Sequence, residues 1–132
     1  MVRATLGEPP YRVDIAIGRH ALVADEHVAQ GGADAGPNPF DMVLAGLAAC
    51  TEITLRMYGE RKRWPPLAIT TTLRHRIEDG RHLIDRRVEV AGAPDEAGLA
   101  RLRDIVERTP VTLALKGGFA ISTELNPVGA AA

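Results

Sequence analysis

The sequence predicts a single α+β domain, residues 1–132, with the element order βββ-α-ββ-α-β. Residues 13–17 alternate apolar and polar side chains, as in a half-buried strand. Residues 42–50 are apolar on every face of a helix, and Asp79-Gly80 is a strong two-residue hairpin turn. Because strands and helices do not alternate one for one, we expect an antiparallel sheet packed on a buried central helix, rather than a Rossmann-like fold.

The first 24 residues are expected to form short strands. Val13, Ile15 and Ile17 would face the interior, and turns are indicated by residues 7–10 and by Gly18-Arg19. Residues 26–37, which are rich in Gly, Asp and Ala, are expected to form a loop.

The clearest helix start follows this loop. Asn38 can act as N-cap, Pro39 at N1 has no N–H to leave unpaired, and Asp41 complements the positive helix end. The helix should end near Gly59, because the prolines at 65–66 cannot continue it. A single sheet would cover only one side of its apolar stretch, so a second subunit is the simplest cover for the other side.

A long hairpin is predicted around Asp79-Gly80. Its mostly apolar face would pair Ile69 with Val90, Thr71 with Val88, Leu73 with Arg86, His75 with Ile84 and Ile77 with His82. A shift of one residue would destroy the pattern on both faces, so the register is well specified. Arg86 on this face is open to three interpretations: a stem reaching the rim, a dimer salt bridge, or a cation near an active site.

The last third of the chain should begin with a second, amphipathic helix over residues 95–108, ended by Pro110. A short turn around residues 112–116 should lead to a last strand, 119–125, and a frayed tail, 126–132.

Composition excludes several classes of function. A formal net charge of −1 gives no general attraction to nucleic acid or to anionic membranes. The longest apolar run is too short to span a bilayer, and residues 1–8 lack the apolar core of a signal peptide. The single cysteine, Cys50, excludes an intrachain disulfide and fits a reducing compartment. We therefore expect a cytoplasmic protein with neither nucleic-acid nor membrane partners.

Other candidate side chains give weak signals. His75 and His82 share a hairpin face, but no Cys or carboxylate completes a tetrahedral set, so no metal is expected. The glycine pairs are turns rather than phosphate loops, so no cofactor is expected. Asp25 and Glu26 are interpreted either as loop anchors or as a source of a catalytic carboxylate.

Several segments together resemble the bacterial-type OsmC/Ohr family, in its OsmC-like branch. They are Ala24-Asp25-Glu26, residues 31–39, residues 44–51, Met57-Tyr58 and Arg108-Thr109-Pro110-Val111. The resemblance covers nearly the whole chain, and the loop–helix–cysteine segment is its most specific part. It implies an OsmC-like fold, an intertwined homodimer with two active sites at the interface, and reduction of hydroperoxides by a pair of cysteines.

The resemblance also assigns residues. The first family cysteine corresponds to Cys50, the implied nucleophile, which a hydroperoxide would convert to a sulfenic acid. The second corresponds to Thr109, which cannot form a disulfide; it either ends a helix or hydrogen-bonds Cys50 or a ligand. The family glutamate after Asn-Pro corresponds to Phe40, and no motif fixes the family arginine, although Arg19 lies in the right region.

Two main hypotheses of function remain open. In the first, the chain is a single-cysteine thiol peroxidase of the hydroperoxide-reductase kind, in which an external thiol reduces the sulfenic acid at Cys50. In the second, the dimer has lost peroxidase activity and binds a small apolar or acyl ligand without catalysis. A structural stress-response role without any ligand is a third interpretation.

Overall fold

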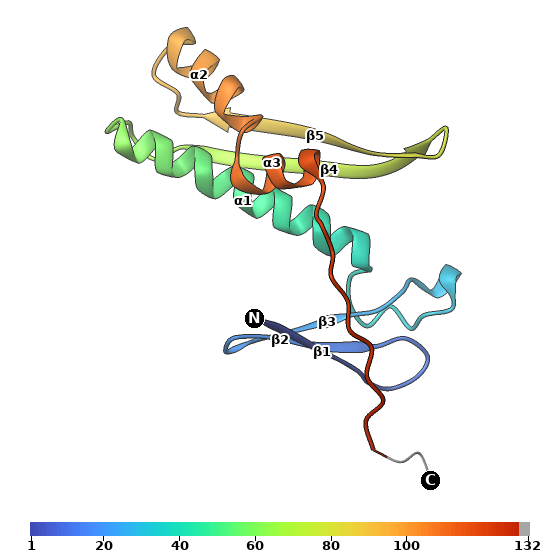
Figure 1. Cartoon of the computed structure of the whole chain (residues 1–132). Helices are drawn as coiled ribbons and strands as arrows, with labels where there is room; N and C mark the ends of the chain where they lie inside the picture. Colours follow the sequence, from blue (N-terminus) through green and yellow to red (C-terminus); the bar gives the residue numbers. More distant parts are fainter. Residues whose placement is uncertain (130–132) are drawn as a thin grey trace.

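The computed structural model describes residues 1–129, which form two small antiparallel sheets and three α-helices (Figure 1). In chain order the elements are β1 (Val2–Leu6), β2 (Val13–Ile17), β3 (His20–Ala24), a 3-10 turn (Val28–Gln30), α1 (Pro39–Arg61), β4 (Ala68–Glu78), β5 (Arg81–Ala91), α2 (Glu96–Val106) and α3 (Pro110–Gly117). The predicted α+β class with antiparallel sheets is confirmed.

The chain has two parts joined by the start of α1. Strands β1, β2 and β3 form a three-stranded sheet with Val13 opposite both Leu6 and Ala24. The β4–β5 hairpin packs on α1, and α2 and α3 also contact α1. Figure 1 shows the three-stranded sheet beside the N-terminal end of α1, well apart from α2.

Helix α1 begins as its sequence predicts. The Asn38 side chain accepts a 2.8 Å hydrogen bond from the Asp41 backbone N–H, and Pro39 is the first helical residue. The helix ends at Arg61, two residues beyond the expected Gly59, and the left-handed backbone of Arg63 (φ 59°) follows it.

Only one side of α1 is buried in the single chain. Leu44, Leu47 and Leu55 face inward. On another side Ile53 and Met57 are each 54% exposed. The predicted apolar helix is therefore present, but its side with Ile53 and Met57 has no cover within residues 1–129.

The hairpin has the predicted register, including Leu73 opposite Arg86 and His75 opposite Ile84. Two polar side chains of α1 fasten it. Glu52 Oε1 accepts a 3.1 Å hydrogen bond from the Thr71 N–H, and Arg56 Nη2 donates to the Leu67 carbonyl at 2.7 Å. The helix and the hairpin are therefore held together by hydrogen bonds between side chains of α1 and the backbone as well as by apolar contact.

The apolar core is small and lies where α1, α2 and the hairpin meet. Leu55, Leu67 and Leu102 are almost fully buried there. Trp64 and Tyr58 pack against them, and the rings of these two residues meet edge to face. A two-stranded hairpin needs such a helix packed on it to be stable in water.

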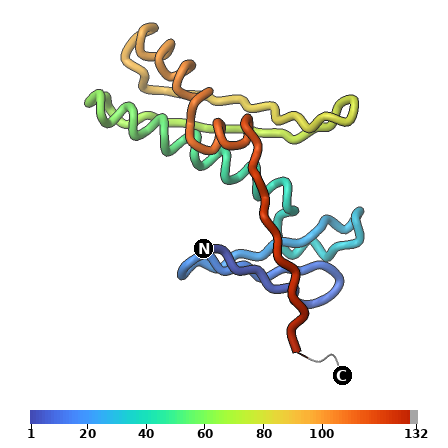
Figure 2. Tube along the Cα trace, viewed as in Figure 1, coloured from blue at the N-terminus to red at the C-terminus, as the bar shows by residue number. Residues whose placement is uncertain are grey.

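The C-terminal part differs from the prediction in two ways. Where a turn around residues 112–116 was expected, Pro110–Gly117 form α3, because Thr109 caps a new helix whose first residue is a proline. The last strand, 119–125, is wrong for the single chain: Phe119 to Leu125 make no strand pairing and run outward as an extended, exposed segment (Figure 2). A strand exists only through its neighbours, and within residues 1–129 this segment has none.

Residues 130–132 of the expected tail lie outside the described residues. Across residues 1–129, no helix combines the length and the apolarity needed to cross a membrane.

Candidate functional site

Cys50 lies in the middle of α1 and is partly exposed. Its Sγ is 3.9 Å from the Thr54 hydroxyl, one turn further along the helix. It borders the uncovered apolar side of α1, where Ile53 and Met57 are exposed. Within residues 1–129, the hydrogen bond found for this thiol is the one shared with Thr54, and none comes from an arginine.

Thr109 is completely buried and is the N-cap of α3. Its Oγ1 accepts a hydrogen bond from the Thr112 N–H at 3.3 Å and lies 2.6 Å from the Thr112 hydroxyl. Over the described part of the chain, both of its side-chain hydrogen bonds go to Thr112. The structure therefore supports a structural role for Thr109 and gives it no hydrogen bond to Cys50.

Arg86 occupies the centre of this region. Its Nη1 donates to the hydroxyls of Thr51 (3.0 Å) and Thr112 (2.9 Å), and its Nη2 donates to the Val106 carbonyl (2.9 Å). One guanidinium thus joins β5, α1, α3 and the C-terminal end of α2. We call Arg86, Thr51, Thr109, Thr112 and the Val106 carbonyl the Arg86 cluster.

The sequence marks Arg86 as unusual, because it is a charged residue on the mostly apolar face of the hairpin, but leaves its role open. The Arg86 side chain is only 12% exposed, so it is not a stem reaching solvent at the rim. The signal was its position on the apolar face of the hairpin. The two threonines that accept its hydrogen bonds, Thr51 and Thr112, lie far from each other and from Arg86 along the chain, so they could not be matched to it from the sequence.

Thr51 and Cys50 point in different directions from α1. Consecutive helical residues are about 100° apart around the axis. Thr51 is fully buried and turned toward Arg86, and its hydroxyl also donates to the Leu47 carbonyl at 2.7 Å. Thr51 therefore takes part in the Arg86 cluster, whereas the neighbouring Cys50 makes its hydrogen bond with Thr54, outside the cluster.

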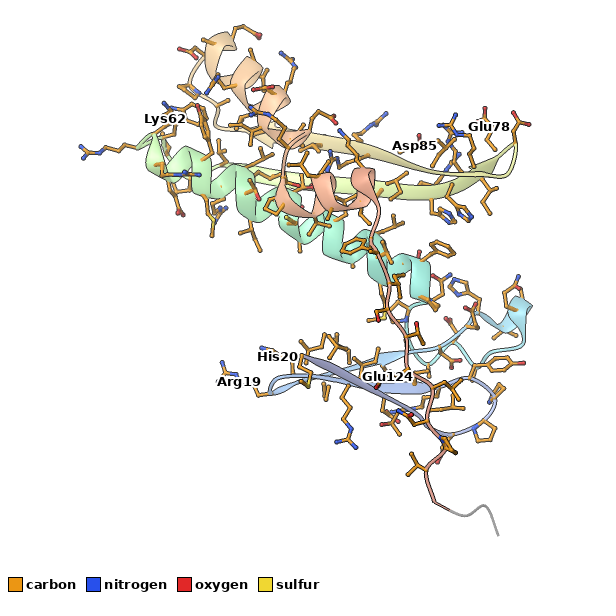
Figure 3. The ribbon with its side chains drawn as sticks, in the orientation of Figure 1. Arg19, His20, Lys62, Glu78, Asp85 and Glu124 are labelled. Atoms are coloured by element: carbon orange, nitrogen blue, oxygen red, sulfur yellow. The ribbon has the colours of Figure 1, made fainter. Side chains whose placement is uncertain are left out.

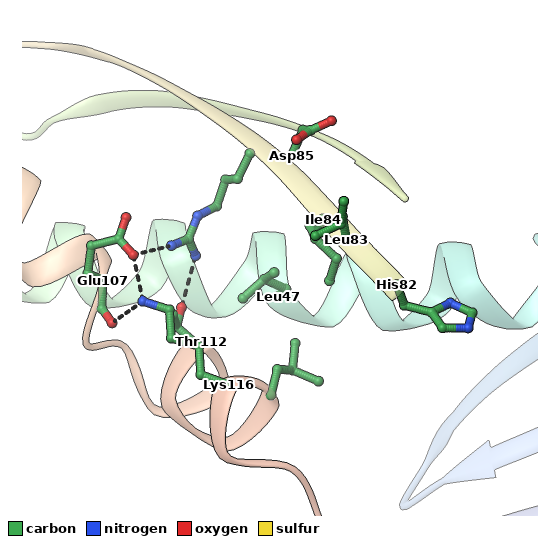
Figure 4. A pocket seen from close by; sticks show the side chains of 10 residues that line it. Leu47, His82, Leu83, Ile84, Asp85, Glu107, Thr112 and Lys116 are labelled. Carbon is green, nitrogen blue, oxygen red and sulfur yellow. Dashed lines mark hydrogen bonds and ion pairs between the residues drawn. The ribbon is translucent and has the colours of Figure 1, made fainter. Parts of the chain in front are cut away.

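A cavity of about 530 Å³ opens beside the Arg86 cluster, between β5 and α3 (Figure 4). Glu107 and Lys116 stand at its polar end with Arg86. Lys116 Nζ donates to the Glu107 carboxylate at 2.7 Å, and Arg86 Nη2 is 4.0 Å from the same carboxylate. Chiefly because of the hydrogen bond from Lys116, the pKa of Glu107 is lowered from its ordinary value.

His75 and His82 form a pair at the far end of the hairpin. His75 Nε2 lies 2.8 Å from His82 Nδ1, and Phe40 stacks on His75 with 4.1 Å between ring centroids. Phe40, at the position of the family glutamate, thus fastens the hairpin to the start of α1 and supplies no charge. No group of three or more His, Cys, Asp or Glu side chains suited to a metal ion is found within residues 1–129.

Asp25 is a buried loop anchor. Its carboxylate accepts hydrogen bonds from the backbone N–H of Ala35 (3.1 Å) and of Glu26 (2.7 Å), and these two bonds, Ala35 first, hold its pKa below the ordinary value. Arg19 lies at the turn between β2 and β3, exposed and at one end of the three-stranded sheet (Figure 3). In the single chain these residues are separate from the Arg86 cluster.

Comparison with known proteins gives the family. Residues 31–124 match the model of the family described as OsmC-like protein. The chain belongs to the OsmC-like protein family. This membership is consistent with a redox or stress-related protein, and it covers the loop before α1, Cys50, the hairpin and Thr109.

Solved structures of OsmC-like proteins share the fold. The chain is 22% identical to an OsmC-like protein from Mycoplasma pneumoniae, with a TM-score of 0.70 and coverage of 89% of this chain and 86% of that one. An organic hydroperoxide resistance protein from Legionella pneumophila is 19% identical, with a TM-score of 0.65 and coverage of 89% and 88%. The organic hydroperoxide resistance protein OhrB of Bacillus subtilis is 21% identical, with a TM-score of 0.59 and coverage of 89% and 90%. No curated protein matches the chain.

Proposed function

We propose that this OsmC-like protein reduces organic hydroperoxides with Cys50 as its only redox cysteine. The Cys50 thiolate attacks the outer peroxide oxygen of ROOH, the O–O bond breaks, and the products are the Cys50 sulfenic acid and the alcohol ROH after protonation. Two molecules of an external thiol then reduce the sulfenic acid, giving a disulfide of that thiol, water and the free Cys50 thiol.

Three features support this proposal. Family membership covers the segment that carries Cys50. The cysteine is partly exposed, as attack on a substrate requires, and its surroundings on α1 are apolar, as an organic hydroperoxide would favour. Thr109 cannot supply a second sulfur, so the reductant must come from outside, and a reducing cytoplasm would provide it.

We also propose that the working form is a homodimer, in which a second copy covers the exposed apolar side of α1. Ile53 and Met57 lie on that side, next to Cys50, and the outward segment Phe119–Leu125 has the alternating pattern of a strand without a partner. Burying both surfaces against a second copy would remove apolar area from water. Light scattering of the wild type and of Ile53→Glu would test this: dimer mass for the first and monomer mass for the second are expected.

The first experiment is a peroxidase assay with cumene hydroperoxide and dithiothreitol or a lipoyl thiol as reductant. Wild type is compared with Cys50→Ser, and oxidation of Cys50 is followed by mass spectrometry after trapping of the sulfenic acid. We expect turnover and a trapped sulfenic acid in the wild type and neither in the variant. A folded wild-type protein that neither consumes peroxide nor oxidises at Cys50 would rule the enzyme out.

A second candidate is a ligand-binding protein without peroxidase activity. The cavity between β5 and α3 favours it, because its charged end adjoins the Arg86 cluster and its lining does not include Cys50. Thr109 also favours this candidate. It stands where the family has its second cysteine, and its hydrogen bonds with Thr112 give that position a structural role instead of a redox role. Negative results in the peroxidase assay together with ligand binding would select this candidate.

A further inference from the structure

The cavity between β5 and α3 has one charged end, and leucine and isoleucine side chains line most of the wall between that end and His82. We propose that it binds a small ligand with an apolar tail and a single oxyanion head, the chemistry of a medium-chain carboxylate. This proposal rests on the second candidate function, ligand binding, and does not depend on the reactivity of Cys50.

The charged end carries more positive than negative charge. Arg86 is nearly buried, and its three hydrogen bonds go to uncharged oxygens of Thr51, Thr112 and Val106. The carboxylate within ion-pair range is Glu107, at 4.0 Å. A guanidinium removed from water without a counter-charge in hydrogen-bond contact is costly, so an anion placed beside it is favoured.

Glu107 is already bound by a second cation. Lys116 Nζ donates to its carboxylate at 2.7 Å and to its backbone carbonyl at 3.3 Å. Two cations therefore share one carboxylate. Asp85 also lines the cavity, but its carboxylate is bonded to Arg76 at 2.6 Å.

The cavity can also supply a hydrogen bond to the head group. An ammonium has three N–H donors, and two of those of Lys116 are used by Glu107. The third remains for a ligand, and the Lys116 side chain is 56% exposed, so it can turn toward one. A carboxylate would thus be held by a charge-assisted hydrogen bond and by the field of Arg86.

The other end of the cavity fits a hydrocarbon tail. Leu47, Ile84 and Leu115 line it, and Figure 4 shows Leu47 and Ile84 between the charged end and His82, which lies furthest from Glu107. A volume of about 530 Å³ is in the range of small-molecule sites. A cavity with an apolar wall and two cations sharing one carboxylate should prefer a ligand that has both an apolar tail and a negatively charged head.

Calorimetric titration tests the proposal with three probes of equal chain length: octanoate, octan-1-ol and octylammonium. We expect octanoate to bind about tenfold more tightly than octanol, the usual size of a charge-assisted hydrogen bond, and octylammonium not to bind. Lys116→Gln should weaken octanoate about tenfold, whereas Glu107→Gln, which removes the competing carboxylate, should strengthen it several-fold.

Matched controls come from the exposed pair on α2, in which Arg103 Nη1 is 3.9 Å from Glu96. Arg103→Gln and Glu96→Gln change the net charge equally and should leave octanoate binding unaltered. The proposal is overturned if octanol binds as tightly as octanoate, if none of the probes binds, or if the α2 variants act like the cavity variants. The titration contains no peroxide or thiol, so hydroperoxide turnover without octanoate binding would refute the ligand proposal alone.

Discussion

Replacing Arg86 by methionine should destabilise the protein more than any other single exposed or half-buried charge change in the hairpin. The substitution keeps an apolar stem of similar length but removes the donor for the hydroxyls of Thr51 and Thr112 and for the Val106 carbonyl. Thr51 is fully buried and Thr112 nearly so, and water cannot easily replace the lost donor.

The size of the effect follows from these contacts. Leaving a buried polar group without its partner typically costs about 1–3 kcal/mol, and Arg86→Met takes the donor from three such acceptors, so a total loss of about 3–5 kcal/mol is expected. With a urea m-value of about 2 kcal/mol per molar, that loss lowers the unfolding midpoint by about 2 M.

The assay is urea unfolding followed by circular dichroism, at one fixed protein concentration so that any association affects both proteins alike. Arg87→Met is the matched control, since Arg87 is the next residue of β5, is exposed, and should change stability by no more than about 0.5 kcal/mol. If Arg86→Met stays within about 1 kcal/mol of the wild type, the Arg86 cluster is not what joins the four elements.

Two further changes probe the buried polar groups. Thr109→Val removes the cap of α3 and the contact with the Thr112 hydroxyl, and should lower stability by about 1–2 kcal/mol in the same urea assay, whereas exposed Thr123→Val should have no effect. Asp25 has a pKa below its ordinary value in the folded protein, so its stabilisation is present above the unfolded pKa and is lost as the pH falls through the folded pKa. Urea midpoints from pH 7 to pH 3 should therefore fall less steeply in Asp25→Asn than in the wild type; equal slopes would show that the loop carboxylate does not couple to folding.

Local signals predicted much of the fold. The helix start at Asn38 depends on one side chain and the three residues after it, and the hairpin register follows from a two-residue turn and alternation on both faces. Both features are determined by residues close together in the sequence, so they can be predicted from the sequence alone. The end of the chain is different: α3 depends on the cap at Thr109, and the extended segment 119–125 lacks the neighbour that would make it a strand.

The candidate site was harder to predict than the fold. Cys50 is noticeable as the only cysteine, but the Arg86 cluster joins Thr51, Arg86 and Thr112, whose spacing follows no local period. An arginine on an apolar strand face indicates that a buried polar partner exists, but the sequence does not show which residue that partner is. Lys116 and Glu107, nine residues apart, meet only because α3 turns back beside the end of α2.

The separation of Cys50 from the Arg86 cluster gives the last prediction. Neighbouring positions on α1 should respond very differently: Cys50→Ser changes a partly exposed thiol near Thr54 and should cost less than about 1 kcal/mol. Thr51→Val keeps the shape but removes the acceptor for Arg86 at 3.0 Å, and should cost about 1–3 kcal/mol because a buried charged donor loses a partner. Urea unfolding of both variants checks the contrast. Equal costs would mean that the thiol is part of the buried network, and loss of peroxidase activity in Cys50→Ser could then reflect damaged packing. The predicted difference would leave Cys50→Ser folded, so that its activity reports on the chemistry of the thiol itself.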